Sequence, residues 1–79
     1  MNISAVYQDT RDRLSLSYGA GEARAMTRII FEDAFNWRSG RQDRDMIPTE
    51  QAQLATILSR LEVGEPLQYI MELADFYGL

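Results

Sequence analysis

Apolar residues recur along this chain at the spacing of an α-helix, and glycine or proline interrupts the recurrence. The clearest segment begins at Pro48. Its apolar positions follow one another at i, i+3, i+4 and i+7 and are Leu54, Ile57, Leu58 and Leu61. A stripe of this kind buries one face of a helix and leaves the other face to solvent. Either Thr49 caps this helix or Pro48 occupies its first turn.

Two more helices are predicted before this one. The first runs from about Ile3 to Ser17, and its stripe is Ile3, Val6, Tyr7, Thr10 and Leu14. Gly19 and Gly21 then break the chain. The second helix runs from Glu22 to about Trp37. Its stripe is Ala23, Met26, Ile30, Ala34 and Trp37, widened by Ile29, Phe31 and Phe35. A stripe this broad indicates a central helix, and core packing explains it better than a ligand pocket.

The rest of the chain predicts a loop and a further short helix. Ser39–Ile47 is polar and charged and is expected to be a loop, with at most one helical turn. Gly64 ends the helix that begins at Pro48, as a left-handed cap. Pro66 starts another short helix. Its buried face is expected to come from Leu67, Ile70, Met71 and Leu73.

These segments predict an all-α fold, a bundle of four to five short helices with residues 1–79 as a single domain. A chain of 79 residues has room for one hydrophobic core. The aromatic tail Asp75–Leu79 stops abruptly, so we expect the natural chain to continue beyond it.

Composition excludes several classes of function. The chain has no cysteine, which rules out disulfides and thiolate metal sites and favours a cytoplasmic setting. It has no histidine, the commonest zinc ligand and general base, so no metal site is predicted. A net charge of −4 disfavours binding to nucleic acid. No apolar run approaches the roughly 20 residues of a membrane helix.

One glycine motif tests the idea of a nucleotide site. Gly19-Ala20-Gly21 begins like a dinucleotide fingerprint, and Leu14–Tyr18 before it alternates as a strand would. The sixth position, however, is Arg24, where a small residue is needed for close packing of helix on strand. No second strand follows to supply an acid for the ribose. A turn between two helices is therefore the better interpretation, and no cofactor is predicted in this chain.

Catalytic groups are also missing. Carboxylates are paired along the chain, but none of the pairs lies among apolar residues that would separate two pKa values; the pairs are Asp9/Asp12, Glu32/Asp33 and Asp43/Asp45. The last pair alternates with Arg41 and Arg44, which suggests local ion pairing or plain solvation. The serines have no histidine, cysteine or lysine to work with. The fragment itself is predicted not to be an enzyme.

A motif near the end of the chain points to a protein family, which composition alone does not identify. The C-terminal part of the chain carries a motif of three pieces: Arg60, then Gly64-Glu65-Pro66-Leu67-Gln68-Tyr69-Ile70, then Asp75-Phe76-Tyr77-Gly78-Leu79. This motif resembles the end of the N-terminal domain of the HemK/PrmC protein-glutamine methyltransferases. The start of the second helix, Glu22-Ala23-Arg24, also fits that family. The motif's residues have structural duties that explain them without a binding role: Gly64 caps a helix, Pro66 starts one, and Tyr69 and Ile70 pack.

The resemblance implies an activity for the parent enzyme. Such enzymes transfer a methyl group from S-adenosylmethionine to the glutamine of the Gly-Gly-Gln motif in peptide chain release factors. The cofactor and the Asn-Pro-Pro-Tyr motif belong to a catalytic domain that is absent from these 79 residues. One position departs from the family: Glu72 stands where glycine is usual, so the helix continues there or turns in another way.

The function predicted from this resemblance is recognition of substrate. The domain would help to bind the release factor and would adjoin its own catalytic domain. Candidate contacts are Arg24, Arg28, Arg38 and Arg41, with Trp37 if part of its ring is exposed, because arginine and tryptophan are enriched at binding hot spots. The alternative is a stand-alone helical module for protein interaction or oligomerisation.

Overall fold

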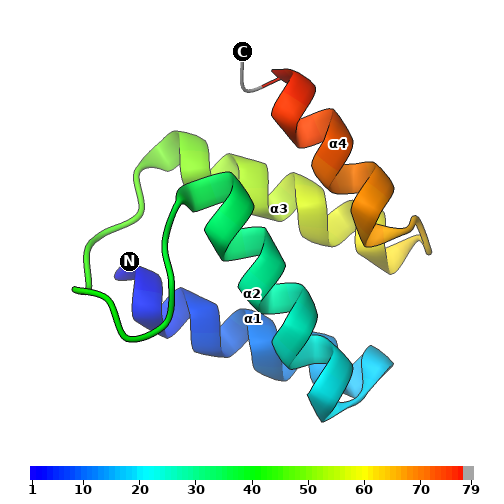
Figure 1. Ribbon diagram of the computed structural model, residues 1–79, viewed down its shortest axis with the longest axis horizontal. Helices are drawn as coiled ribbons and strands as arrows, with labels where there is room; N and C mark the ends of the chain where they lie inside the picture. The colour runs from blue at the N-terminus through cyan, green and yellow to red at the C-terminus, as the bar shows by residue number, and fades with distance from the viewer. Residues whose placement is uncertain (78–79) are drawn as a thin grey trace. The chain divides into compact units, whose positions relative to one another are not determined.

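The structure is a computed structural model that describes the backbone of residues 1–77 and the side chains of residues 1–72. Within residues 1–77 it has four α-helices and no strand: α1 Ile3–Tyr18, α2 Ala20–Phe35, α3 Pro48–Glu62 and α4 Leu67–Tyr77 (Figure 1). The all-α prediction is confirmed, and the stretch Leu14–Tyr18 is helical. The chain divides into two compact units, Met1–Met46 and Ile47–Leu79.

A single glycine joins α1 to α2. Gly19 adopts φ +85°, a backbone region that residues with a Cβ atom rarely enter. Its N–H donates to the carbonyl of Ser15 at 3.0 Å, and its own carbonyl accepts from the N–H of Ala23 at 2.9 Å. One residue thus ends α1 and begins α2. The prediction that Gly21 also breaks the chain is wrong, because Gly21 lies inside α2.

The core of the first unit forms between α1, α2 and the loop that follows them. All five residues of the predicted α1 stripe are buried. On α2 the buried apolar residues are Ala23, Met26, Ile30, Phe31 and Phe35. Ile29 is instead 38% exposed and Ala34 is partly exposed, so the predicted stripe was too broad on that side. Thr27 is buried within it, and its hydroxyl donates to the carbonyl of Ala23 at 2.7 Å.

The end of α2 differs from the prediction by two residues. The helix stops at Phe35 because Asn36 takes a left-handed conformation, φ 51° and ψ 42°. The N–H of Trp37 then donates to the carbonyl of Phe31 at 3.0 Å, a bond typical of a helix that ends in a left-handed residue. Trp37 is therefore outside the helix, and its ring packs edge-on against Tyr7 and Phe31 at centroid distances of 5.4 and 6.2 Å.

In the second unit, Pro48 is the first residue of α3 and Ile47 is its N-cap. Of the two predicted starts, the one with proline in the first turn is confirmed. The Ile47 side chain has no acceptor atom, but the carboxylate of Glu50 accepts the backbone N–H of Ile47 at 3.2 Å. The apolar stripe from Leu54 to Leu61 is buried as predicted.

The turn from α3 to α4 explains much of the motif in this region. Gly64 has φ +92°, which confirms the left-handed cap. The N–H of Glu65 donates to the carbonyl of Arg60 at 3.2 Å, and that of Gly64 to Leu61 at 3.0 Å, which together make a Schellman motif. The side chains of Arg60 and Glu65 form an ion pair of 2.9 Å across the same turn. Arg60, Gly64 and Glu65 of the motif thus stabilise the C-terminal end of α3.

The helix α4 continues through Glu72 to Tyr77, so the departure from glycine leaves the helix unbroken. Ile70 and Met71 are buried as predicted, and Leu67 is partly exposed. Tyr69 is 50% exposed, so its predicted packing role is wrong. The side chain of Leu73, and Gly78 and Leu79 altogether, lie outside the described residues. Across the part of the chain that is described, no helix has both the length and the apolar character to cross a membrane.

Candidate protein-contact surface

The segment 36–46, which follows α2, returns to the beginning of the chain. The N–H of Ile3 donates to the carbonyl of Arg44 at 2.6 Å, and the N–H of Met46 donates to the carbonyl of Met1 at 2.9 Å. Met46 is buried. Residues predicted as a solvated loop are thereby fixed against the start of α1, and the candidate contacts Arg38 and Arg41 stand on a defined backbone.

Asp43 caps α1 from this segment. Its Oδ1 accepts the backbone N–H of Ser4 at 3.0 Å, and its Oδ2 accepts the side-chain amide of Asn2 at 2.8 Å. Asn2, the N-cap by position, makes no side-chain cap of its own. The hydrogen bond from the Ser4 backbone holds the pKa of Asp43 below its ordinary value, although some desolvation of the carboxylate opposes this effect. The local alternation of charges indicates ion pairing or plain solvation and does not predict this capping role.

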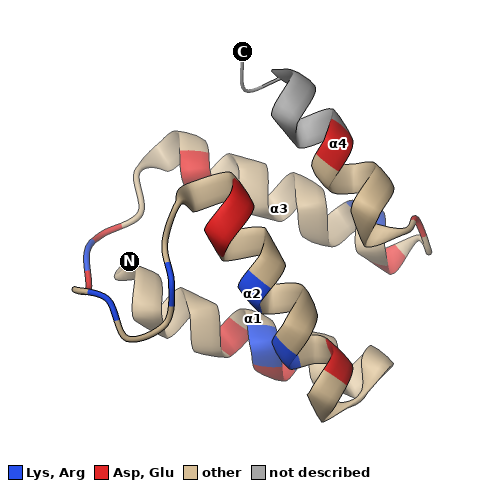
Figure 2. Ribbon diagram, viewed as in Figure 1, with Lys and Arg blue, Asp and Glu red and all other residues tan. Residues whose placement is uncertain are grey.

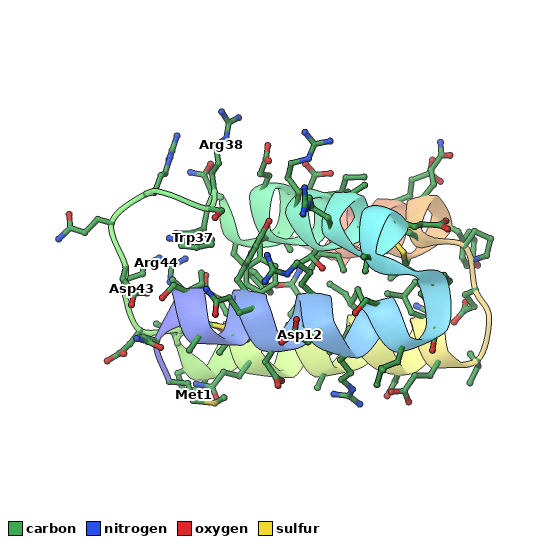
Figure 3. The ribbon with its side chains drawn as sticks, turned by 90° about the horizontal axis from the view of Figure 1, so that it is seen from below. Met1, Asp12, Trp37, Arg38, Asp43 and Arg44 are labelled. Atoms are coloured by element: carbon green, nitrogen blue, oxygen red, sulfur yellow. The ribbon has the colours of Figure 1, made fainter. Side chains whose placement is uncertain are left out.

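Arg44, the next residue, serves the opposite end of the neighbouring helix. Its guanidinium donates to the carbonyl of Phe35, the last residue of α2, at 3.2 Å. A carboxylate at the start of α1 and a guanidinium at the end of α2 each match the partial charge of the helix end they contact. Figure 3 shows both residues beside the segment that begins at Met1.

Trp37 is buried beneath the segment 36–46 and holds its backbone in place. Its side chain is only 5% exposed, and its Nε1 donates to the carbonyl of Gln42 at 3.2 Å. Figure 3 shows it on the inner side of the loop. The prediction made Trp37 a contact on the condition that part of its ring is exposed, and that condition is hardly met. Its contribution is to shape the loop.

An open polar depression of about 170 Å³ lies where α2 meets this loop. Three of the predicted contact residues line it, Trp37, Arg38 and Arg41, together with residues that sequence reasoning did not single out as contacts: Glu32, Asp33 and Asn36. Arg38 donates to Glu32 at 3.3 Å across it, and the side chain of Arg38 is 65% exposed. Figure 3 shows Arg38 pointing away from the helices.

Arg24 and Arg28 lie apart from the depression on the exposed side of α2. They are one helical turn apart, about 6 Å along the axis. Figure 2 shows these positive segments of α2 followed by the acidic segment that contains Glu32 and Asp33. Arg24, Arg28 and Glu32 stand four residues apart and therefore share one side of the helix.

Among residues with described side chains, no group of three or more histidines, cysteines, aspartates or glutamates is placed to hold a metal ion. The other two predicted carboxylate pairs, Asp9/Asp12 and Glu32/Asp33, each have one member beside an arginine. The Oδ1 of Asp12 lies 3.9 Å from the Nε of Arg11, and Glu32 forms an ion pair with Arg38.

Comparison with known proteins gives one match. The family model described as the PrmC N-terminal domain matches residues 5–71. That range includes α1 from its third residue on, all of α2 and α3, and the Schellman turn with Gly64–Ile70, the first part of the motif that carries the resemblance; Asp75–Leu79 lie beyond it. No curated protein and no solved structure matches the chain.

Proposed function

Because the chain belongs to the PrmC N-terminal domain family, we propose that it is the release-factor-binding domain of a release factor glutamine methyltransferase. The parent enzyme would methylate the glutamine of the Gly-Gly-Gln motif from S-adenosylmethionine bound in a separate catalytic domain. The observation that carries this proposal is the family match over residues 5–71. Release factors act on ribosomes, so the proposal places the protein in the cytoplasm.

The domain's contribution would be binding at a distance from the reaction. Contacts remote from the reacting glutamine can hold the substrate in an orientation from which methyl transfer is faster. The chain has no histidine, cysteine or lysine, which supports a division of labour in which proton transfer and methyl transfer belong to the catalytic domain. The segment 36–46, fixed by Asp43 and Arg44, would give the contact residues a preorganised backbone.

We place the release-factor contacts on the surface made by Arg24, Arg28, Arg38 and Arg41. Arg38 and Arg41 border the polar depression at the end of α2, and the other two continue along the same helix. Guanidinium groups on a fixed backbone suit recognition of a protein surface, because they offer several hydrogen-bond donors in a planar array. Trp37 would act beneath them, by holding the loop in shape.

The test is a titration of the 79-residue chain into purified release factor, in which isothermal calorimetry measures the heat of binding. The proposal predicts saturable binding. A release factor whose Gly-Gly-Gln glutamine is replaced by alanine serves as the matched partner, and it should bind equally well because the contacts are remote from that glutamine. Absence of binding to both forms would contradict the proposal. Sedimentation equilibrium of the chain alone checks the alternative, since an oligomerisation module would self-associate.

A further inference from the structure

The eight arginines of the chain divide into two groups by what their side chains contact. Four have named partners: Arg11 lies by Asp12, Arg38 by Glu32, Arg44 by the Phe35 carbonyl and Arg60 by Glu65. Arg13 also has a partner within the molecule. The other three guanidinium groups, those of Arg24, Arg28 and Arg41, make no hydrogen bond or ion pair with the described part of the chain.

These three guanidinium groups are exposed and belong to one unit. Arg24 and Arg28 project from α2, and Arg41 borders the depression at the end of the same helix. Each presents five N–H donors that carboxylate oxygens can accept. The Met1–Met46 unit carries seven arginines against seven carboxylates, whereas Ile47–Leu79 carries one arginine against five. The net charge of −4 therefore belongs to the second unit and does not describe this surface.

One carboxylate that could compete for these guanidinium groups, Glu32, is already engaged. Glu32 shares a side of α2 with Arg24 and Arg28 and lines the depression that Arg41 borders. Its Oε1 accepts from Arg38 at 3.3 Å, and its side chain is 30% exposed. Because Arg38 neutralises Glu32, the three remaining guanidinium groups stay available to an external anion.

The charge pattern favours a protein over a nucleic acid. Glu22 and Asp33 are exposed on α2 within a turn or two of the arginines, and they would repel a continuous phosphate backbone. Separate carboxylates on a folded protein can be placed between such charges, and arginine pairs with carboxylates in a bidentate geometry. The surface therefore fits a partner whose acidic side chains alternate with basic or neutral ones.

We propose that Arg24, Arg28 and Arg41 form a carboxylate-binding surface that receives an acidic patch of the partner protein. The identification of that partner as the release factor rests on the proposed function. Rim charges of this kind act mainly on the rate of encounter and on selectivity. Binding should accordingly weaken as salt rises from about 0.05 M to about 0.5 M, since screening shortens the reach of exposed charges.

The decisive experiment compares two charge reversals of equal size in the 79-residue chain. R24E/R28E alters the proposed surface, and R11E/R13E makes the same change of charge on α1. Affinity for purified release factor should fall at least about tenfold for the first variant and much less for the second. The triple variant R24Q/R28Q/R41Q removes charge without adding repulsion beside Glu32, so it provides the result if R24E/R28E proves unfolded by circular dichroism.

The outcomes separate the two proposals. If the unaltered chain does not bind release factor, the proposed function fails. If it binds and a folded R24E/R28E or R24Q/R28Q/R41Q variant binds equally well, only the carboxylate-binding surface is overturned. Equal losses in the α1 control would also overturn it, because net charge alone would then explain the effect. Tighter binding to a ribosomal RNA fragment than to release factor would overturn the choice of an acidic protein.

Discussion

The Oδ1 atom of Asp43 accepts a 3.0 Å hydrogen bond from the backbone N–H of Ser4, a residue 39 positions earlier in the chain. The first N–H groups of a helix have no partner within the helix and need an acceptor from elsewhere. Asn2 stands at the N-cap position without filling this role, and Asp43 fills it from the loop after α2. The same hydrogen bond therefore stabilises α1 and positions the loop that carries the candidate contacts.

Replacing Asp43 by asparagine should lower the thermal midpoint by about 3–6 °C, because a weaker, uncharged acceptor would remain at the start of α1. Asp45→Asn is the matched control. It removes the same charge two residues away, at a position whose backbone forms an isolated antiparallel bridge with Asn2. Thermal unfolding followed by circular dichroism measures both variants. Equal midpoints for the two would show that the cap contributes nothing.

The pH dependence follows from the same carboxylate. The hydrogen bond from Ser4 lowers the pKa of Asp43 in the folded chain below the ordinary 3.8, so the unfolded chain takes up the proton first as pH falls. The stabilisation is thus complete above the ordinary pKa and is lost as pH drops through the lowered one. The midpoint difference between the unaltered chain and Asp43→Asn should be constant from pH 7 to about 5 and shrink below about 4. A difference that grows in acid would have the wrong sign.

Two glycines should respond to alanine in opposite directions. Gly64 has φ +92°, a conformation that strains any residue with a Cβ atom, whereas Gly21 lies within α2 without a positive φ; open space surrounds both. Gly64→Ala should destabilise the fold by about 1 kcal/mol, and Gly21→Ala should stabilise it by about 0.5–1 kcal/mol. Urea unfolding gives both values. A loss of stability at Gly21 would contradict the extension of α2 to Ala20.

We predict that residues 1–79 unfold as a single domain even though the fold has two compact units. The second unit has 33 residues, and chains below about 40 residues rarely fold without disulfides or metals. Trp37, the single tryptophan, reports on the first unit, while circular dichroism at helical wavelengths reports on all helices. The two transitions should coincide on heating. Loss of helicity at a lower temperature than the change in Trp37 fluorescence would show that the units unfold independently.

The parts of the fold that periodicity could predict are those governed by neighbours in sequence. Spacing alone predicts the apolar stripes of α1 and α3, and both stripes are buried. The same holds for Pro48 and Gly64, whose conformational preferences act within a single turn. The end of α2 was misplaced because the apolar pattern runs on into Trp37, while the left-handed Asn36 ends the helix before it.

The candidate surface was less predictable because its geometry depends on distant contacts. The sequence indicated Arg38 and Arg41 by residue type, and both line the depression. It did not indicate Asp43 and Arg44, since their partners, Ser4 and Phe35, are 39 and 9 positions away. Trp37 shows the converse. Its residue type suggested a hot spot, but aromatic packing against Tyr7 buries it.

The measurement that tests the central claim most directly is a titration of the ¹⁵N-labelled chain with unlabelled release factor, monitored by amide chemical shifts. A protein of 9.1 kDa gives well-resolved spectra. If this domain binds the release factor through the carboxylate-binding surface, the amide signals of Arg24, Arg28 and Arg41 should shift or broaden, while those around Arg11 and Arg13 should not. Unchanged spectra in excess release factor, or changes confined to α1, would contradict the account.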